Sequence, residues 1–162
     1  TLADHLNKKD LGNNAVVVSP DVGGVTRARN LAAKLGAPLA IIDKRRPAHN
    51  VSEIMNVIGE VEGKSVILID DIIDTAGTVC NAADIMMEKG AKEVFVCCTH
   101  PVFSGPAMER LAKAPIQEII VTNTIPLREK LPNLTVLSIA PLIGEAVLRI
   151  HEDLSVSKIF ED

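Results

Sequence analysis

An acidic pair that runs into a turn of threonine and glycine is the strongest chemical signal in the chain. The segment DDIIDTAGT spans residues 70–78, between a run of β-branched residues and a helical pattern. Thr75, Gly77 and Thr78 place hydroxyls and unpaired backbone N–H groups at a helix N-terminus, where the helix dipole also favours a phosphate. The two leading aspartates would repel a phosphate, so they suit sugar hydroxyls, or Mg²⁺ held through water. The unit therefore predicts binding of a phosphorylated sugar.

Each half of this unit has an ordinary structural explanation when it is taken alone. An Asp-Asp pair at a strand end is commonly solvated surface, and a Thr-x-Gly-Thr turn is commonly a helix cap. Their union in one strand, loop and helix favours a binding site over either explanation.

Two other predicted strands end in segments that could contact a ligand. PDVGG at residues 20–24 has glycines that permit close backbone approach, and Asp21 offers a carboxylate there. KRRP at residues 44–47 places three cations in succession in a chain of net charge −4. Alone, Asp21 could equally be a turn residue, and the basic run would be a solvated turn if no phosphate site lay nearby. Ligands bind outside the carboxyl ends of parallel strands, so these segments are the first places to look for a site.

The strands that position these segments are predicted from short apolar runs rich in β-branched residues. Continuous apolar character is typical of strands that are buried on both faces of a sheet. The predicted strands are Ala15–Ser19, Pro38–Asp43, Ser65–Asp71, Glu93–Thr99, Gln117–Thr122 and Leu134–Ile139. Because they alternate with helical segments, the sequence predicts an α/β fold with a doubly wound, mainly parallel sheet and helices on both faces.

Apolar residues at helical spacing predict the helices between these strands. Gly36 and Gly90 end the first two helices, and Ser104 with Pro106 reads as the capped start of a third. A fourth helix is predicted from Pro141 onward.

Two segments leave alternatives open. The segment Lys44–Gly63 fits a helix or a strand and is left undecided. Residues 1–14 are polar and read as a lead-in helix or as a severed connection. Residues 15–162 are predicted to form a single domain.

Composition excludes several classes of function. The chain has 162 residues, with 17 Lys and Arg against 21 Asp and Glu, which argues against sequence-independent nucleic-acid binding. No apolar run has the length of a membrane span, and the N-terminus lacks the layout of a signal peptide. The three cysteines fit neither a disulfide framework nor a metal finger, so a cytoplasmic location is expected. The histidines share no metal-ligand spacing and read as surface or packing residues: His5, His49, His100 and His151.

The motifs also resemble a known family. VILIDDIIDTAGT at residues 66–78 is similar to the phosphoribosyl diphosphate loop of the type I phosphoribosyltransferase fold. With SPDVGGVTRAR at 19–29, IIDKRRP at 41–47 and CCTHPVFSGPA at 97–107, it resembles the ribose-phosphate pyrophosphokinase family over nearly the whole chain. The resemblance covers the C-terminal half of that family, whose chains carry two similar α/β domains. The N-terminal half, with the main ATP-binding segments and a metal-binding histidine, has no counterpart here.

The resemblance implies a substrate site for ribose 5-phosphate. Asp70 and Asp71 would hold the ribose hydroxyls. The 5-phosphate would be cradled by Asp74, Thr75, Ala76, Gly77 and Thr78. The chain alone is therefore expected to bind ribose 5-phosphate, to lack the main ATP site and to be inactive.

The resemblance also implies a catalytic role for part of the basic run. Lys44 and Arg46 would belong to a mobile loop that closes over ATP, and Asp21 would be a ligand of the cofactor Mg²⁺. The implied reaction transfers diphosphate from ATP to ribose 5-phosphate, giving phosphoribosyl diphosphate and AMP. The full-length family forms homo-oligomers, dimers assembled into hexamers, and Ser155 with Ser157 would contribute to a regulatory site there.

Two further functions compete with this one. The first is a non-catalytic associated or regulatory subunit that uses the same fold to bind phosphoribosyl ligands. The second is a nucleobase phosphoribosyltransferase, which shares the cradle but needs a hood for its base, and no such segment is apparent. A binder needs only the cradle, whereas phosphoryl transfer also needs cations on the moving groups, so Lys44 and Arg46 favour a catalytic ancestry.

Overall fold

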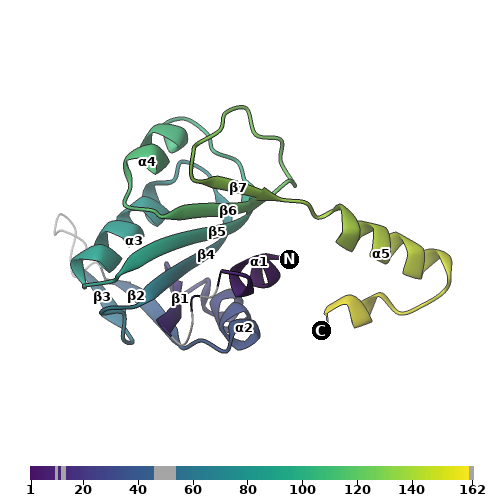
Figure 1. The fold of residues 1–162 in the computed structure, drawn as a ribbon, viewed down its shortest axis with the longest axis horizontal. Coiled ribbons are helices and arrows are strands. Elements are labelled where there is room, and N and C mark those ends of the chain that lie inside the picture. The colour runs from purple at the N-terminus through teal and green to yellow at the C-terminus, as the bar shows by residue number, and fades with distance from the viewer. Residues whose placement is uncertain (10, 12–13, 46–53, 161–162) are drawn as a thin grey trace.

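The protein is described by a computed structural model that covers residues 1–9, 11, 14–45 and 54–160. Within these ranges one sheet of seven strands runs in the order β3-β2-β1-β4-β5-β6-β7 (Figure 1). The strands are β1 (Ala15–Ser19), β2 (Leu39–Arg45), β3 (Ile54–Ile58), β4 (Ser65–Ile73), β5 (Glu93–Pro101), β6 (Glu118–Thr122) and β7 (Leu134–Leu137). The pair β2 and β3 is antiparallel and the other neighbouring pairs are parallel.

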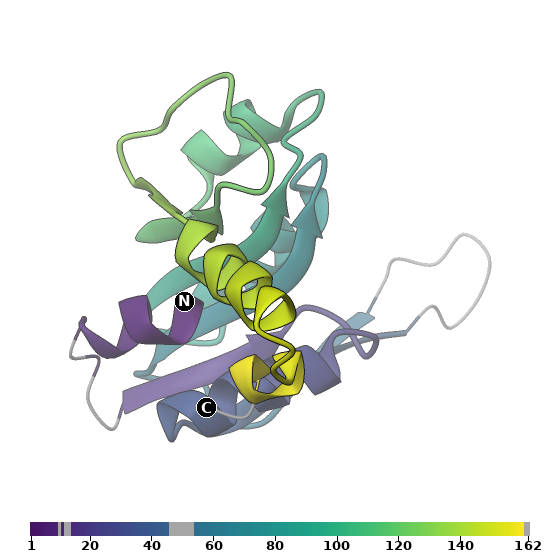
Figure 2. The same cartoon turned by 90° about the vertical axis from the view of Figure 1, so that its right-hand side faces the viewer.

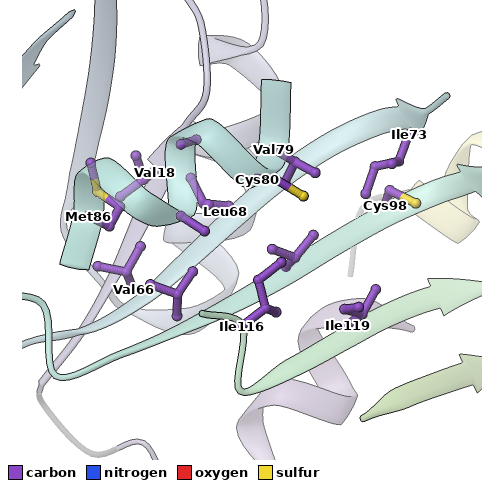
Figure 3. Close-up of a cluster of buried hydrophobic side chains, with 14 of the residues drawn as sticks. Val18, Val66, Leu68, Ile73, Val79, Cys80, Met86, Cys98, Ile116 and Ile119 are labelled. Carbon is purple, nitrogen blue, oxygen red and sulfur yellow. The ribbon is translucent and has the colours of Figure 1, made fainter. Parts of the chain in front are cut away.

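Helices cover both faces of this sheet, as the sequence predicts. The helices are α1 (Leu2–Asn7), α2 (Val25–Leu35), α3 (Gly77–Glu88), α4 (Ala107–Lys113) and α5 (Ala140–His151), with a 3₁₀ helix η2 (Val156–Phe160). Alternate residues of β4 supply the two cores: Val66 and Leu68 pack with α3 and α4, whereas Ile67 packs with α1 and α2. Figure 3 shows Val79 and Met86 of α3 over Val66 and Leu68. The α/β fold predicted from the apolar runs is confirmed.

The segment left undecided by the sequence contains a strand. Within Lys44–Gly63, the described residues include β3, which pairs antiparallel with β2 at the edge of the sheet. Strands β4 and β5 run two residues past their predicted ends, because they pair with each other as far as Ile73 and Pro101.

The N-terminal segment contains a helix that packs on the sheet. Leu6 of α1 is buried in the same core as α2. Glu118 of β6 connects this segment to the sheet, because its carboxylate contacts His5 Nε2 at 3.2 Å and Lys9 Nζ at 2.5 Å. The same carboxylate accepts a hydrogen bond from Thr135 Oγ1 of β7 at 2.6 Å. The described part of residues 1–14 therefore contains a helix, Leu2–Asn7.

Glu118→Gln is expected to lower the free energy of unfolding at pH 7 by about 1 kcal/mol. Burial opposes ionisation of Glu118, but hydrogen bonds from Lys9, Thr135 and His5 hold its pKa below the usual value. A carboxylate with a lowered pKa stabilises the fold above its unfolded pKa of about 4.3 and loses that contribution as the pH falls through the folded value. Urea unfolding should therefore give the variant a lower free energy of unfolding than the unaltered chain at pH 7, and this difference should shrink below pH 4. A deficit of equal size at both pH values would contradict the assignment.

Helix α4 begins differently from its prediction. It starts at Ala107 with Pro106 as the N-cap, and no side chain caps it. Ser104 is therefore not the capping residue, because its hydroxyl instead donates to the Asp74 carboxylate across the sheet edge.

Helix α5 and η2 leave the sheet after β7 and extend away from it (Figures 1 and 2). No residue of either element is buried. None of the helices in the described ranges has the length and hydropathy needed to cross a bilayer.

Candidate functional site

The carboxyl ends of the central strands bring the predicted acidic and glycine-rich segments to one edge of the sheet. Strand β1 leads into the PDVGG turn, and its neighbour β4 carries Asp70 and Asp71 near its end. The turn after β4 then enters α3. The parallel pairing of β1 with β4 places both segments at the same edge.

Arg27 of α2 bridges the acidic pair. Its Nη1 lies 3.2 Å from Asp70 Oδ1 and its Nη2 lies 2.6 Å from Asp71 Oδ2. The guanidinium therefore contacts one oxygen of each carboxylate. Because a carboxylate offers about four acceptor positions, the pair keeps capacity for further donors such as sugar hydroxyls.

The two carboxyl groups have different affinities for a proton. Burial raises the pKa of Asp70 to about 6, with a further contribution from the neighbouring Asp71 charge. Burial also opposes ionisation of Asp71, but its hydrogen bond with Asp70 and the Arg27 guanidinium keep its pKa below the usual value. At neutral pH both groups are therefore charged, and Asp70 takes up a proton near pH 6.

The turn between β4 and α3 leaves backbone N–H groups available for an anion. The first hydrogen bond within α3 runs from Cys80 N to Ala76 O, so the N–H groups before Cys80 lack a partner inside the helix. Ala76 has a φ of 61°, a left-handed conformation that is unfavourable for a residue other than glycine. Such a conformation in a loop at a strand end is common in ligand-binding turns.

Side chains from α4 and the loop before it hold this turn in place. Arg110 Nη1 donates to the Thr75 carbonyl at 2.9 Å, which satisfies the acceptor beside the N–H groups. A Cβ atom on Gly77 would lie 3.3 Å from Arg110 Nη1, so glycine leaves room for this contact. The Ser104 hydroxyl donates to the carboxylate of Asp74. The turn is thus fixed by residues about 30 positions away in the chain.

The PDVGG turn has its own internal support. Gly24 N donates to Asp21 Oδ1 at 2.8 Å, and the buried Ser19 hydroxyl donates to the Asp21 carbonyl at 2.6 Å. A Cβ atom on Gly24 would lie 2.8 Å from Ser19 Oγ, which is closer than packing permits. Asp21 therefore stabilises the turn, and it stays exposed at the sheet edge.

The fit of this edge to Mg²⁺ depends on one carboxylate. Among the described residues, no three His, Cys, Asp or Glu side chains converge as a metal-binding group. Mg²⁺ is commonly held by one or two carboxylates together with water and substrate phosphates, so the exposed Asp21 is compatible with that mode.

Of the two cations predicted to act on ATP, only Lys44 falls within the described residues. Its backbone lies near the carboxyl end of β2, three residues past Ile41, which pairs with Ser19 of β1. Arg46 lies outside the described residues. Ser155 and Ser157 are exposed beyond α5, with their hydroxyl oxygens 2.7 Å apart.

Three contacts of the site were missed by the sequence reasoning. Arg27 stands within the SPDVGGVTRAR motif, and its position one turn into the helix after the glycines is a signal that could have identified it. Ser104 likewise stands within the motif CCTHPVFSGPA, whereas Arg110 lies outside the quoted motifs and 35 positions from its partner Thr75.

Comparison with known proteins gives consistent matches. A family model described as phosphoribosyl synthetase-associated domain matches residues 44–161. A ribose-phosphate pyrophosphokinase of Caldanaerobacter subterraneus subsp. tengcongensis is 58% identical, over 98% of this chain and 51% of its own length. Ribose-phosphate pyrophosphokinase 1 of Listeria monocytogenes is 56% identical, over 99% of this chain and 51% of its own. The chain thus spans about half the length of these curated relatives.

Solved structures agree with the sequence matches. The crystal structure of phosphoribosylpyrophosphate synthetase from Mycobacterium smegmatis superposes with a TM-score of 0.86 at 44% identity, over 94% of this chain and 50% of that one. Adenine phosphoribosyl transferase from Trypanosoma brucei superposes with a TM-score of 0.59 at 18% identity, over 85% of this chain and 61% of that one, which shows a shared fold.

Proposed function

The chain belongs to the phosphoribosyl synthetase family, and from this premise we propose that it forms the C-terminal half of a ribose-phosphate pyrophosphokinase. The proposed reaction transfers the β,γ-diphosphoryl group of ATP to the anomeric hydroxyl of ribose 5-phosphate. The anomeric oxygen forms a bond to the β-phosphorus, the bond from that phosphorus to the α-phosphate oxygen breaks, and AMP leaves. The hydroxyl proton passes to solvent, and the sugar product is phosphoribosyl diphosphate.

The observation that carries this proposal is the joining of an acidic pair and an anion-binding turn in one unit. The N–H groups at the start of α3 suit the 5-phosphate, because they are unpaired inside the helix and lie at its positive end. Asp70 and Asp71 precede that turn by a few residues and suit the ribose hydroxyls. The phosphate would contact residues of the turn: Asp74, Thr75, Ala76, Gly77 and Thr78.

Diphosphate transfer requires positive charge on the moving phosphates. Lys44, near the end of β2, and Arg46, two positions further along the sequence, would supply it, and Asp21 would hold Mg²⁺ together with substrate phosphates. When bound, Mg²⁺ would neutralise charge on the transferred group. The transfer depends on positioning and charge neutralisation rather than on a protein nucleophile.

The proposal extends to the setting of the whole enzyme. The second α/β half would provide most of the ATP site, so the chain alone would bind ribose 5-phosphate without turnover. A cytoplasmic location and a homo-oligomer, a hexamer in the full-length protein, are part of the same proposal. Ser155 and Ser157 would contribute regulatory contacts between subunits, and neither nucleic acid nor membrane is a proposed partner.

A second candidate function is a non-catalytic associated subunit that binds phosphoribosyl ligands. It is favoured by the description of the matching family model, which names an associated domain. The two candidates share the sugar-phosphate site and differ in whether the basic run at residues 44–47 acts on ATP.

Calorimetric titration of the 162-residue chain with ribose 5-phosphate and with ATP, each in Mg²⁺, tests the proposal. An assay of AMP release follows on the same preparation. Binding of ribose 5-phosphate without AMP release is the expected result. AMP release that depends on ribose 5-phosphate would mean that this chain holds a complete ATP site. Failure to bind ribose 5-phosphate would remove the proposed substrate site.

Thr78→Val is expected to weaken ribose 5-phosphate binding by about 10- to 100-fold, the loss of one hydrogen bond to a charged group. Thr78 stands in the first turn of α3, so its hydroxyl can join the backbone N–H groups around a phosphate. Calorimetry at fixed pH and salt measures the change. Thr78→Ser keeps the hydroxyl and should retain affinity within about 2-fold. Equal affinities for the valine and serine variants would remove the hydroxyl from the cradle.

A further inference from the structure

Three successive carbonyl groups between β4 and α3 accept hydrogen bonds from the part of the chain that follows β5. The bonds run from Phe103 N to Ile73 O at 3.1 Å, from Ser104 N to Asp74 O at 3.0 Å and from Arg110 Nη1 to Thr75 O at 2.9 Å. Because the three acceptors are consecutive in the chain, one side of this stretch of backbone is held at every residue.

These bonds set the direction of the N–H groups in the same stretch. In a planar trans peptide the carbonyl and the N–H group point in opposite directions. The Thr75 carbonyl shares a peptide unit with the Ala76 N–H group, so the bond from Arg110 directs that N–H group away from α4. The other two bonds direct the N–H groups of Asp74 and Thr75 in the same way. In the part of the chain that the structure describes, none of these three N–H groups has a hydrogen-bond partner. Successive N–H groups that face one side form a concave site for an anion.

The donor to the third carbonyl differs from the other two. Phe103 and Ser104 donate through the backbone, whereas Arg110 donates through a charged side chain. A hydrogen bond with an ionised donor is stronger than a neutral one, and it polarises the group that accepts it. The bond from Arg110 therefore both orients the peptide unit and makes its N–H group a better donor.

An ion pair does not explain the place of Arg110. Within residues 1–9, 11, 14–45 and 54–160, no carboxylate forms an ion pair with its guanidinium, whereas Lys113 of the same helix lies 2.6 Å from Glu109. The guanidinium instead lies against the start of α3, since a Cβ atom on Gly77 would be 3.3 Å from Arg110 Nη1. A cation without an acidic partner thus stands one peptide unit behind the proposed phosphate site.

The segment that supplies the backbone donors is held in an unfavourable conformation. Phe103 has a φ of 48°, in the left-handed region that a bulky side chain rarely adopts. Its side chain packs against the core, and the neighbouring Ser104 hydroxyl donates to the Asp74 carboxylate. Such a conformation persists where surrounding contacts impose it, and it is common at ligand-binding sites.

We propose that Arg110 is a positioning residue for the 5-phosphate of the sugar substrate, because it holds the Thr75 carbonyl and thereby aims the Ala76 N–H group at the phosphate. The strength of phosphate binding then depends on a side chain that does not touch the substrate. This inference rests on the proposed function, because it takes the presence of a phosphate at this turn from it.

Calorimetric titration of the 162-residue chain with ribose 5-phosphate tests the role of Arg110. Arg110→Met keeps the aliphatic stem but removes the donor and the charge, so affinity should fall by about 10-fold or more. Arg110→Lys keeps a charged donor and should recover part of that loss. The matched control Lys113→Met removes an exposed cation from the same helix and should bind within about 2-fold of the unaltered chain.

Salt separates positioning from a general effect of positive charge. At about 0.5 M salt the Debye length is near 4 Å, so charge effects that act through solvent are largely screened. The deficit of Arg110→Met should persist under this condition, because a peptide unit without its donor stays misdirected at any salt concentration. A deficit that vanishes at high salt would overturn the positioning role.

Amide NMR provides a measurement that a merely structural role would not change. Saturation with ribose 5-phosphate should move the Ala76 amide proton of the unaltered chain downfield. In Arg110→Met at saturation, this shift should be much smaller, whereas the shift of the Asp74 amide should remain, because the Phe103 bond still holds the Ile73 carbonyl. If Arg110 only held α4 against α3, the variant would not single out one N–H group. Equal Ala76 shifts in the two proteins would contradict the proposal.

The same titrations distinguish the two ways in which this inference can fail. An unaltered chain that does not bind ribose 5-phosphate would remove the proposed substrate site, and the role of Arg110 with it. An unaltered chain that binds, together with an Arg110→Met variant of equal affinity, would contradict only the positioning role.

Discussion

Lys44→Ala in an enzyme that carries both halves is expected to lower turnover by about 100-fold or more while leaving ribose 5-phosphate affinity within about 3-fold. The ammonium group is proposed to stabilise charge on the transferred diphosphate, which is a transition-state interaction, so its loss should appear in kcat. The structure is consistent with separate roles for Lys44 in turnover and for the acidic pair in sugar binding. Strand β1 lies between β2, which carries Lys44, and β4, which carries the acidic pair. Steady-state AMP release and calorimetry with ribose 5-phosphate measure the two quantities.

Arg45→Ala provides the matched control for Lys44. It removes a neighbouring cation from the same basic run, and the family resemblance gives that residue no role. Its turnover should stay within about 5-fold of the unaltered enzyme, since a general loss of positive charge near the loop has a small and salt-dependent effect. Equal losses for the two variants would indicate a diffuse electrostatic effect, and near-normal turnover of Lys44→Ala would remove Lys44 from the mechanism.

The elements that position the site were predictable from local patterns. The apolar runs identify β1, β4, β5 and β6, because their short length and their many β-branched residues favour a strand over a buried helix. The edge strand β3 could not be predicted from the sequence in the same way. Its residues fit helical spacing as well as strand spacing, and only pairing with β2 decides between them.

The contacts that shape the site were less accessible to sequence reasoning. The turn at residues 74–78 is a local feature, and its glycine and threonines indicate an anion-binding helix start. The bridge from Arg27 to the acidic pair joins residues more than 40 positions apart, so no local pattern predicts it. For Ser104 the local pattern predicted a helix cap that does not form, because its hydroxyl donates to Asp74, which is distant in the sequence.

Helix α5 illustrates the limit of what periodicity predicts. The apolar spacing after Pro141 correctly predicts a helix, but spacing defines an apolar face and does not identify the surface against which it packs. Helices α2 and α3 carry buried residues, whereas α5 carries none, although all three have apolar residues at helical spacing.

Arg27→Gln is expected to weaken ribose 5-phosphate binding by about 10- to 100-fold at pH 7, the loss of a charged group bonded to two carboxylates. Arg27 lowers the pKa of both Asp70 and Asp71. Without it, two adjacent carboxylates repel each other, and the pKa of Asp70 should rise from about 6 toward neutrality. A protonated Asp70 is a poorer acceptor for a ribose hydroxyl, so affinity falls as the pH drops through the pKa of this group.

The pH profile separates this positioning role from a purely structural one. In the unaltered chain, affinity should fall below pH 6, and in Arg27→Gln the midpoint of the fall should move to higher pH with partial recovery near pH 8.5. Titration of the ligand phosphate, whose second pKa is about 6, is common to both proteins and cancels in their comparison.

Two variants on the same helix provide the controls for Arg27. Arg29→Gln removes an exposed arginine two positions further along α2 and should leave the affinity and its pH profile unchanged. Arg27→Lys keeps the charge but not the two-pronged contact, so it should recover the midpoint of the pH profile and only part of the affinity. If Arg27→Gln weakened binding by the same factor at every pH, Arg27 would serve only to hold α2 against β4, and the acidic pair would not depend on it for its charge.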